Sequence, residues 1–178
     1  MISNLYSTSG AIDWPEVTGH TYYPAGAVNS GGSQSAGLVS LVPIEIYGGR
    51  SFASLVIPAI AGATGNARLG IYADNNGRPG ALIYDAGQIA LAASIDNVLA
   101  FGQTLSGGRY WLAANFSAGN GGTLWKCGAL TKMQNGGAGL SPVYCYTLAS
   151  AYGALPASAA AAVAGTNQAN AVAIGLRA

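Results

Sequence analysis

The stretch that decides the fold is Asn66-Ala-Arg-Leu-Gly-Ile-Tyr-Ala-Asp-Asn-Asn-Gly-Arg-Pro-Gly-Ala-Leu-Ile-Tyr84. Apolar residues at positions 69, 71 and 73 alternate with the residues between them, which is the period of a β-strand with one buried face. The segment from Asp74 to Gly80 is rich in Asn, Gly and Pro, the residues that favour turns. A second strand-like segment, 81–84, follows at once. The sequence therefore predicts a β-hairpin here, with Gly77-Arg-Pro-Gly80 in its turn.

Similar segments flank this hairpin on both sides. Strands are expected at 38–47, 52–60, 88–91, 98–101 and 109–116, with glycine-rich breaks between several of them. Pro43 indicates that the first of these strands bends or lies at a sheet edge, because proline cannot donate a ladder hydrogen bond. In the last of them, alternate residues from Tyr110 to Phe116 share one face. Short strands at this spacing are typical of an antiparallel β-sandwich or barrel.

The pattern is weaker after residue 117. Strands are expected at 123–127, 143–148 and 171–176. The alanine-rich segment Ala157–Ala164 is compatible with a short helix, since Pro156 is tolerated near a helix start, and equally with a loop, since alanine buries little surface. Both alternatives stay open from the sequence.

Residues 1–37 differ from the rest of the chain. They contain aromatic residues without any strand or helix period, followed by a Gly/Ser-rich hinge at 29–37. This composition predicts an extended anchoring arm that becomes ordered by docking onto the same domain, a sister subunit or a scaffold. The aromatic residues expected at that assembly interface are Tyr6, Trp14, Tyr22 and Tyr23. Residues 38–178 are then a single β-sandwich domain.

The charge content is unusually low. Only 7% of the residues are charged, with seven Lys and Arg, six Asp and Glu, and a formal net charge of +1. The few cationic residues are scattered, which argues against the basic footprint that nucleic-acid binding needs. Because free solubility usually depends on a charged surface, we expect other protein to cover part of this surface, as in a homo-oligomer. The alternative is a monomer kept soluble by Ser, Thr, Asn and Gln.

Neither targeting nor membrane insertion is indicated. The N-terminal residues lack a basic region followed by an apolar one, and the apolar segment 157–165 is far shorter than a membrane span. The two cysteines, Cys127 and Cys145, do not have the spacing of a metal site. They are either a disulfide, if their strands are neighbours, or two buried thiols of a protein made in a reducing cytoplasm.

Residues suited to catalysis are few. The single histidine, His20, lies in the arm, a poor place to hold a general base against a substrate. Asp74, Asp85 and Asp96 are spaced by eleven, but each lies in a turn-like context, which favours turn residues over paired catalytic carboxylates. The segment starting at Asp74 lacks the spacing of an EF-hand, leaving a different type of calcium site as the alternative. We expect no enzyme, no cofactor and no metal.

The aromatic residues are the remaining candidates for recognition. Ten Tyr and three Trp outnumber three Phe, a bias toward rings with a polar tip. Trp111 belongs to an alternating strand and is expected in the core. Trp125, Tyr144 and Tyr146 are less patterned, so we expect exposed rings that contact a glycan or another subunit.

The segments 66–87 and 103–113 resemble a jelly-roll module of tailed-bacteriophage structural proteins, namely tail-fibre and capsid-fibre or decoration proteins. The similarity lies in the Arg68-Leu-Gly-Ile-Tyr72, Gly77-Arg-Pro-Gly80 and Tyr110-Trp-Leu-Ala113 motifs. The segments 152–156 and 174–177 are similar to the C-terminal end of that module, so the resemblance covers about residues 38–178.

This resemblance implies a jelly-roll-like antiparallel β-sandwich without catalytic residues. It also implies a structural component of a phage virion, assembled in the bacterial cytoplasm as a homo-oligomer, a trimer by analogy. Its partners would be capsid or tail proteins, bound through the arm. The alternative is a module at a tail or fibre tip that binds a host-surface glycan.

Overall fold

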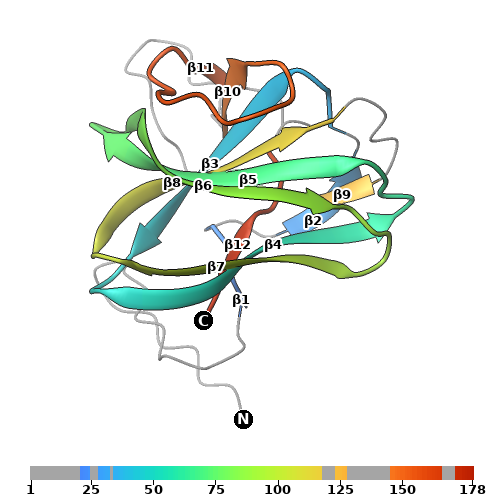
Figure 1. The fold of residues 1–178 in the computed structure, drawn as a ribbon, viewed down its shortest axis with the longest axis horizontal. Helices are drawn as coiled ribbons and strands as arrows, with labels where there is room; N and C mark the ends of the chain where they lie inside the picture. Colours follow the sequence, from blue (N-terminus) through green and yellow to red (C-terminus); the bar gives the residue numbers. More distant parts are fainter. Residues whose placement is uncertain (1–20, 25–27, 33, 118–122, 128–144, 166–170) are drawn as a thin grey trace.

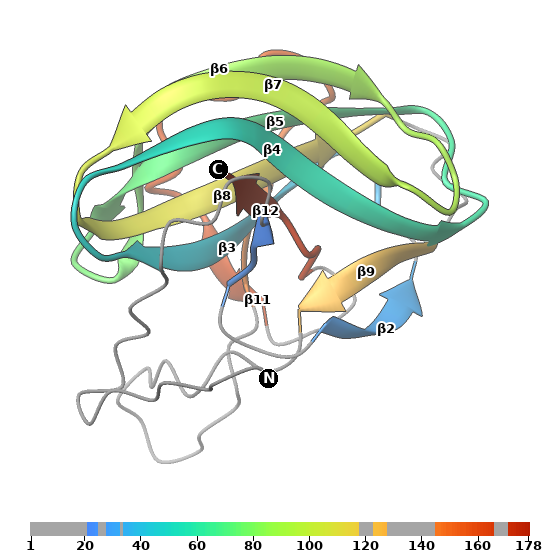
Figure 2. The same cartoon turned by 90° about the horizontal axis from the view of Figure 1, so that it is seen from below.

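The computed structural model describes residues 21–24, 28–32, 34–117, 123–127, 145–165 and 171–178. Every regular element in these ranges is a β-strand, and the strands form two antiparallel sheets packed face to face (Figures 1 and 2). The prediction of an all-β antiparallel sandwich is thereby confirmed, whereas the jelly-roll connectivity stays a prediction. No helix that could cross a membrane occurs in the described ranges.

Six strands form each sheet. The order in the first sheet is β1 (Thr21–Tyr22), β12 (Gly175–Arg177), β4 (Arg50–Ala61), β9 (Thr123–Cys127) and β2 (Val28–Gly32), and β7 (Asp96–Leu105) also pairs with β4. The order in the second sheet is β11 (Val163–Gly165), β10 (Cys145–Ala149), β3 (Leu38–Ile46), β8 (Gly108–Phe116), β5 (Asn66–Asn75) and β6 (Arg78–Ala90). Strands β1 and β2 come from the predicted arm, so this part of the arm docks onto its own domain.

The predicted hairpin is formed by β5 and β6, which pair from Asn66 opposite Ala90 to Asn75 opposite Arg78. Its turn is shorter than expected, because Asn76 and Gly77 both have positive φ angles, 52° and 80°, the conformation of a two-residue hairpin turn. The backbone N–H of Gly77 donates to Asp74 Oδ2 at 2.9 Å. The strand that follows therefore begins at Arg78, and Pro79 and Gly80 belong to it.

The main core lies between the two sheets. Alternate residues of β8, from Leu112 to Phe116, point into it together with Leu55 and Ile57 of β4. The opposite face of β8 is buried as well, since Trp111 and Ala113 belong to a second apolar cluster on the outer side of the second sheet. We call this second group the outer cluster; its buried members are Val39, Leu41, Tyr72, Trp111, Ala113, Tyr146, Leu155, Ala159 and Ala162.

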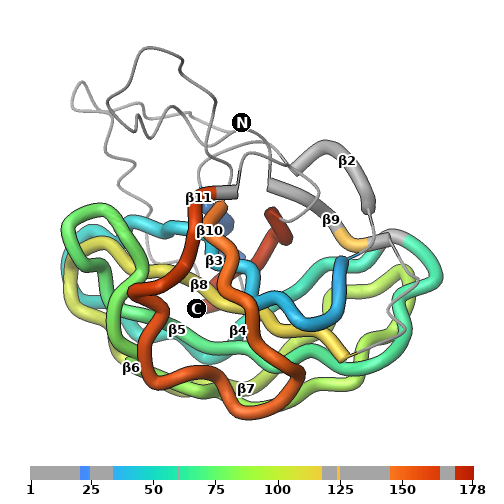
Figure 3. Tube along the Cα trace, turned by 90° about the horizontal axis from the view of Figure 1, so that it is seen from above, coloured from blue at the N-terminus to red at the C-terminus, as the bar shows by residue number. Residues whose placement is uncertain are grey.

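A loop of residues 150–162, called the strap below, covers the outer cluster. Figure 3 shows the strap in orange, running across the outside of the second sheet. Instead of forming a helix, it bonds to β6: Leu82 N donates to Ala157 O and Ala159 N to Gly80 O. The loop alternative for Ala157–Ala164 is thus the correct one up to Ala162, and β11 begins at Val163.

Two side chains of the second sheet also hold the strap. The hydroxyl of Tyr72 donates to Pro156 O at 2.8 Å. The carboxylate of Asp85 accepts from Leu155 N at 3.1 Å, and it forms an ion pair with Arg68 at 2.8 Å. The strap is therefore fixed by polar contacts at its centre as well as by its apolar side chains.

The Tyr72 contact predicts a loss of stability at alkaline pH. Burial, and then the negative charge of Asp85, raise the pKa of Tyr72 to about 12, whereas an unfolded tyrosine titrates near pH 10. Both states are protonated below pH 10. Between pH 10 and 12 the unfolded chain loses the proton first, so the free energy of unfolding should fall, by about 2–3 kcal/mol in total.

Urea unfolding of the wild type and of Tyr72→Phe across pH 7 to 12 measures this effect. At pH 7 the variant should be less stable by about 1 kcal/mol, the value of one hydrogen bond. The difference should shrink and reverse above pH 10, because phenylalanine has no proton to lose. A constant difference across this range would contradict the expected titration.

Three smaller expectations are resolved by the strand pairing. Pro43 lies opposite Trp111 of β8, and on the other side of β3 the described strand β10 pairs with Leu38–Leu41 and does not reach Pro43. The closing strand is shorter than predicted and begins at Gly175; residues 171–174 are buried chain of the main core. Cys145 is buried on β10, and β9, which carries Cys127, belongs to the other sheet; the side chain of Cys127 lies outside the described residues, so both alternatives for the two cysteines stay predictions.

Candidate functional site

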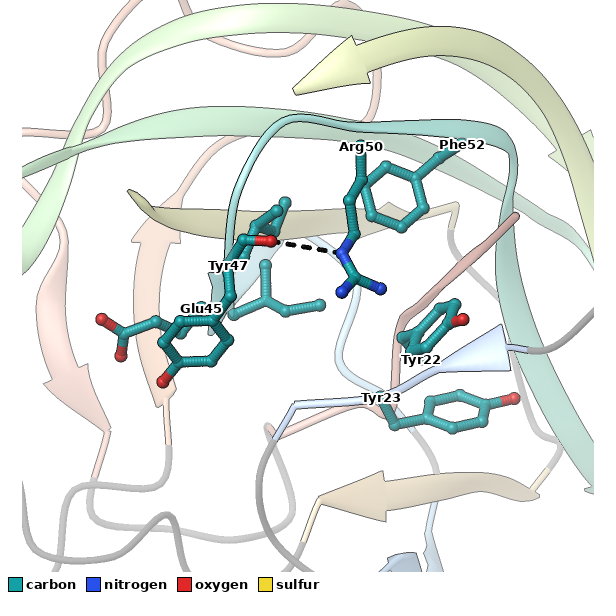
Figure 4. A pocket seen from close by; sticks show the side chains of 8 residues that line it. Tyr22, Tyr23, Glu45, Tyr47, Arg50 and Phe52 are labelled. Carbon is teal, nitrogen blue, oxygen red and sulfur yellow. Dashed lines mark hydrogen bonds between the residues drawn. The ribbon is translucent and has the colours of Figure 1, made fainter. Parts of the chain in front are cut away.

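A small pocket opens where the first described residues of the chain meet the β3–β4 connection. It is lined by Tyr22, Tyr23, Ile44, Glu45, Ile46, Tyr47, Arg50 and Phe52. Its volume is about 40 Å³, room for a few water molecules, which suits a single chemical group better than a sugar ring. Figure 4 shows the aromatic rings and the Arg50 guanidinium arranged around it.

Arg50 is placed by the connection between β3 and β4, which carries the chain from the second sheet to the first. Gly48, with a φ of 72°, allows the chain to reverse between β3 and β4. The Nε atom of Arg50 then donates to Tyr47 O at 3.2 Å. This bond directs the guanidinium toward Tyr22, whose ring meets Phe52 edge to face at 6.3 Å (Figure 4). The pocket therefore combines a cation with aromatic rings.

Glu45 lies on the same rim but is directed elsewhere. Its carboxylate points away from Arg50 in Figure 4 and accepts from Arg109 on β8 at 3.5 Å. Both side chains of this ion pair are exposed, at 39% for Arg109 and 49% for Glu45, so the pair adds little stability. The charge facing into the pocket is thus that of Arg50.

The N-terminal strand β1 is held firmly beside the pocket. Arg177 of β12 donates to Thr21 Oγ1 at 2.9 Å and forms an ion pair with Asp96 at 2.7 Å. A methyl group at Gly175 would come within 2.5 Å of Thr21 and 2.9 Å of the Tyr23 ring. Only glycine at this position lets Thr21 and Tyr23 lie so close to β12.

The structure brings together half of the predicted anchor set. Tyr22 and Tyr23 line the pocket, whereas Tyr6 and Trp14 lie outside the described residues. His20 and Tyr144 lie outside them too. The sequence did not predict Arg50 or Tyr47 as site residues. The signal available for them was the Gly-Gly break before Arg50, which indicates a turn between two strands but not what faces that turn.

The rings expected to be exposed were those of Trp125, Tyr144 and Tyr146, and the structure describes the ring of Tyr146. Tyr146 is 2% exposed and packs edge to face on Trp111 at 5.1 Å, so the expectation of an exposed ring is wrong there. The reason is the strap, which covers this face of the sheet. The backbone of Trp125 lies in β9; the placement of its ring is outside the description. Trp111 is fully buried, which confirms the expectation of a core residue.

The three spaced aspartates are held by structural contacts. The turn interpretation is confirmed for Asp74, which also accepts from Trp111 Nε1 at 2.8 Å. It is wrong in part for Asp85 and Asp96, which belong to strands β6 and β7 and pair with arginines. Asp85 does accept from the Gly87 N–H two residues on, as in a turn. In the described ranges no group of three or more His, Cys, Asp or Glu side chains could hold a metal ion.

Comparison of the chain with protein-family models, with curated proteins and with solved structures found no match. The functional interpretation therefore depends on the residues themselves and on the geometry of the pocket and of strand β1.

Proposed function

We propose that this protein is a non-enzymatic structural component of a bacteriophage virion, a head decoration, head fibre or tail fibre protein that is anchored by its N-terminal arm. The observation that carries the proposal is the attachment of β1 to β12 beside the pocket. It fixes Thr21 and Tyr22, which follow residues 1–20 in the chain, on the sandwich. In this proposal Tyr6 and Trp14 of the arm contact a neighbouring virion protein.

The chemistry of the carboxylates supports a structural role. Asp85, Asp96 and Glu45 each pair with an arginine, and Asp74 accepts from Trp111 and Gly77. A general acid or base needs a carboxylate that faces a substrate site. In the described part of the chain, the carboxylates form ion pairs and hydrogen bonds that connect strands, a turn and the strap.

Most residues of the motifs that carry the phage resemblance are buried in this fold. Tyr72 and Trp111, from two of the three motifs, belong to the outer cluster, and Pro79 and Gly80 of the third are buried in β6. Leu69, Ile71 and Leu112 of the same motifs belong to the main core, so the motifs supply both buried faces of the second sheet. Their resemblance supports a shared module, and the low charge supports assembly into a larger particle.

Removal of the arm tests the proposal. Antibodies against the sandwich should label particles of the phage that encodes this chain, as seen by electron microscopy. A chain without residues 1–20 should lose about nine-tenths of the label when it is supplied below the dissociation constant, because the loss of 1.4 kcal/mol of binding free energy raises that constant about tenfold. The truncated chain should keep its unfolding midpoint. Unlabelled wild-type particles, or equal labelling after truncation, would contradict the proposal.

The expected trimer is tested separately, by measuring the native mass of the purified protein.

The alternative of host-glycan binding has weaker support in the geometry. Of its three candidate rings, Tyr146 is buried under the strap. Binding of the purified protein to host polysaccharide that is abolished by Trp125→Ala would favour that alternative.

A further inference from the structure

Strands β6 and β7 run next to each other along one long edge of the sandwich (Figure 2). They belong to different sheets, and each pairs with one described strand, β6 with β5 and β7 with β4. The ring of Tyr84 on β6 meets the ring of Phe101 on β7 edge to face at 5.4 Å, and this contact joins the two sheets. We call this side of the molecule the β6–β7 edge.

The backbone of β7 offers free hydrogen-bonding groups at this edge. Opposite residues of an antiparallel pair alternate between those that exchange backbone hydrogen bonds and those that do not. Ala59 N donates to Ile95 O at 3.1 Å, so this alternation directs the N–H and C=O groups of Asp96, Val98 and Ala100 away from β4. These groups form no hydrogen bond with another described strand or loop. A further β-strand is the element that complements such a row of donors and acceptors.

The edge strands β1, β6 and β11 are protected from such pairing, whereas β7 is open to it. Proteins protect edge strands by keeping them short, by covering them, or by placing charges, proline or a bulge in them. Strands β1 and β11 have two and three residues, and the strap covers the start of β6 through its bonds to Gly80 and Leu82. Strand β7 has ten residues without lysine, arginine or proline. Its bulge, where Gly102 has a φ of 60°, comes after the regular segment Asp96–Ala100.

We propose that β7 pairs with β7 of a second copy of this chain, antiparallel and about a two-fold axis. The segment Asp96–Ala100 is centred on Val98, so an axis at Val98 pairs the whole segment with itself. Asp96 then lies opposite Ala100 of the second copy, and no like charges face each other. The carboxylate of Asp96 is in addition paired with Arg177 at 2.7 Å. The side chain of Val98, 40% exposed in one chain, packs against its counterpart.

The side chains at the β6–β7 edge favour a second copy as the occupant. Apolar residues of both strands that pack against the main core stay partly exposed here, namely Tyr84, Ala86, Ile89, Leu99 and Phe101. A second copy brings the same apolar row to the axis, so each edge covers the other. A partner selected by its charge gains little, because the carboxylates of β6 and β7 already pair with arginines. This inference goes beyond the proposed virion role, and the contact yields a dimer or joins two trimers.

The native mass of the purified full-length protein tests the pairing. We expect an even number of subunits in the wild type and half of that mass in two variants. Val98→Lys places two lysines opposite each other, and Ala100→Pro removes an outward N–H group while leaving the ladder to β4 intact. The matched control is Thr104→Lys, also exposed on β7 but beyond the bulge, which should keep the wild-type mass. Far-UV circular dichroism checks that each variant is folded.

Hydrogen exchange of single amides tests the position of the contact. Dilution that halves the mass should make the amides of Val98 and Ala100 exchange about fivefold faster, the factor for one hydrogen bond of about 1 kcal/mol. The amides of Asn97 and Leu99, which face β4, should stay equally protected.

A wild-type monomer or trimer would overturn the proposal, as would an even-numbered assembly that Val98→Lys and Ala100→Pro leave intact. Protection of the Val98 and Ala100 amides in particles but not in the purified protein would assign the edge to a different virion protein, and it would overturn the second copy as the occupant. Particle labelling through the arm is measured separately, so failure of this pairing and failure of the virion proposal are distinguishable.

Discussion

Replacement of Gly70 by alanine is expected to destabilise the domain by about 3 kcal/mol, the upper part of the range for overpacking a close-packed site. Gly70 lies in the middle of β5, beneath the strap. A methyl group there would come within 2.4 Å of Leu155 Cδ1 and within 2.5 Å of the Tyr84 carbonyl oxygen. The leucine side chain can move, but the carbonyl belongs to the backbone of β6. Strand β6 or the strap would therefore have to shift.

Urea unfolding of Gly70→Ala measures this cost. The matched control is Gly153→Ala in the strap, where an added methyl group meets no atom within 4 Å, so we expect a change of at most about 0.5 kcal/mol. A second comparison separates the two contacts. In a Leu155→Ala background the leucine contact is absent but the Tyr84 carbonyl is not, so Gly70→Ala should still be costly. If it is neutral there, the close approach of β6 is not what requires glycine.

The contacts of Gly70 explain why a glycine stands inside the Leu69–Tyr72 motif of strand β5. In Leu69-Gly-Ile-Tyr72, the glycine admits the strap and the β6 carbonyl, and Tyr72 donates to the strap at Pro156. Gly70 and Tyr72 thus contact the strap, and Tyr72 and its partner Pro156 are 84 residues apart in the chain. The sequence shows that a glycine interrupts a strand of larger residues, but it does not show which distant residues require the glycine.

The β5–β6 hairpin was predictable although both faces of β5 are buried in the structure. The alternation from Leu69 to Ala73, and the Asn-Gly of its turn, carry the hairpin in a local signal. Strand β8 was predictable as a strand, but its second buried face was not, because the strap that covers Trp111 is a run of Ala, Pro and Ser without period. What orders that run is its backbone bonding to Gly80 and Leu82, which only the fold brings near.

The candidate site was predictable to a similar degree. Tyr22 and Tyr23 stood out as aromatic residues in a segment without strand period, and the pocket contains both. Arg50 and Tyr47 gave no comparable signal, because a charged or aromatic residue beside a turn between two strands is ordinarily exposed to solvent. They become site residues only because β1 pairs with β12, at the far end of the chain, and so places the arm beside the β3–β4 connection.

Replacement of Trp111 by alanine is expected to have the largest effect of any single substitution, about 3–5 kcal/mol. Trp111 is fully buried at the centre of the outer cluster, and its ring meets Tyr146 edge to face at 5.1 Å. Its Nε1 atom donates to Asp74 Oδ1 at 2.8 Å. Truncation would open a cavity between the sheet and the strap, and it would leave the Asp74 carboxylate without one of its donors.

The variant Trp111→Phe separates packing from hydrogen bonding. Phenylalanine keeps much of the apolar contact and loses the bond to Asp74, a bond to a charged group worth about 1.5–3 kcal/mol. A double-mutant cycle with Asp74→Ala, which removes the acceptor, should therefore give a coupling free energy of that order. Tyr110→Phe, one residue away, is the control: its hydroxyl bonds are to Ser106 and exposed, so we expect a change of at most about 0.5 kcal/mol. If Trp111→Ala costs no more than Trp111→Phe, the strap does not close over a packed cluster, and the second face of β8 contributes little to stability.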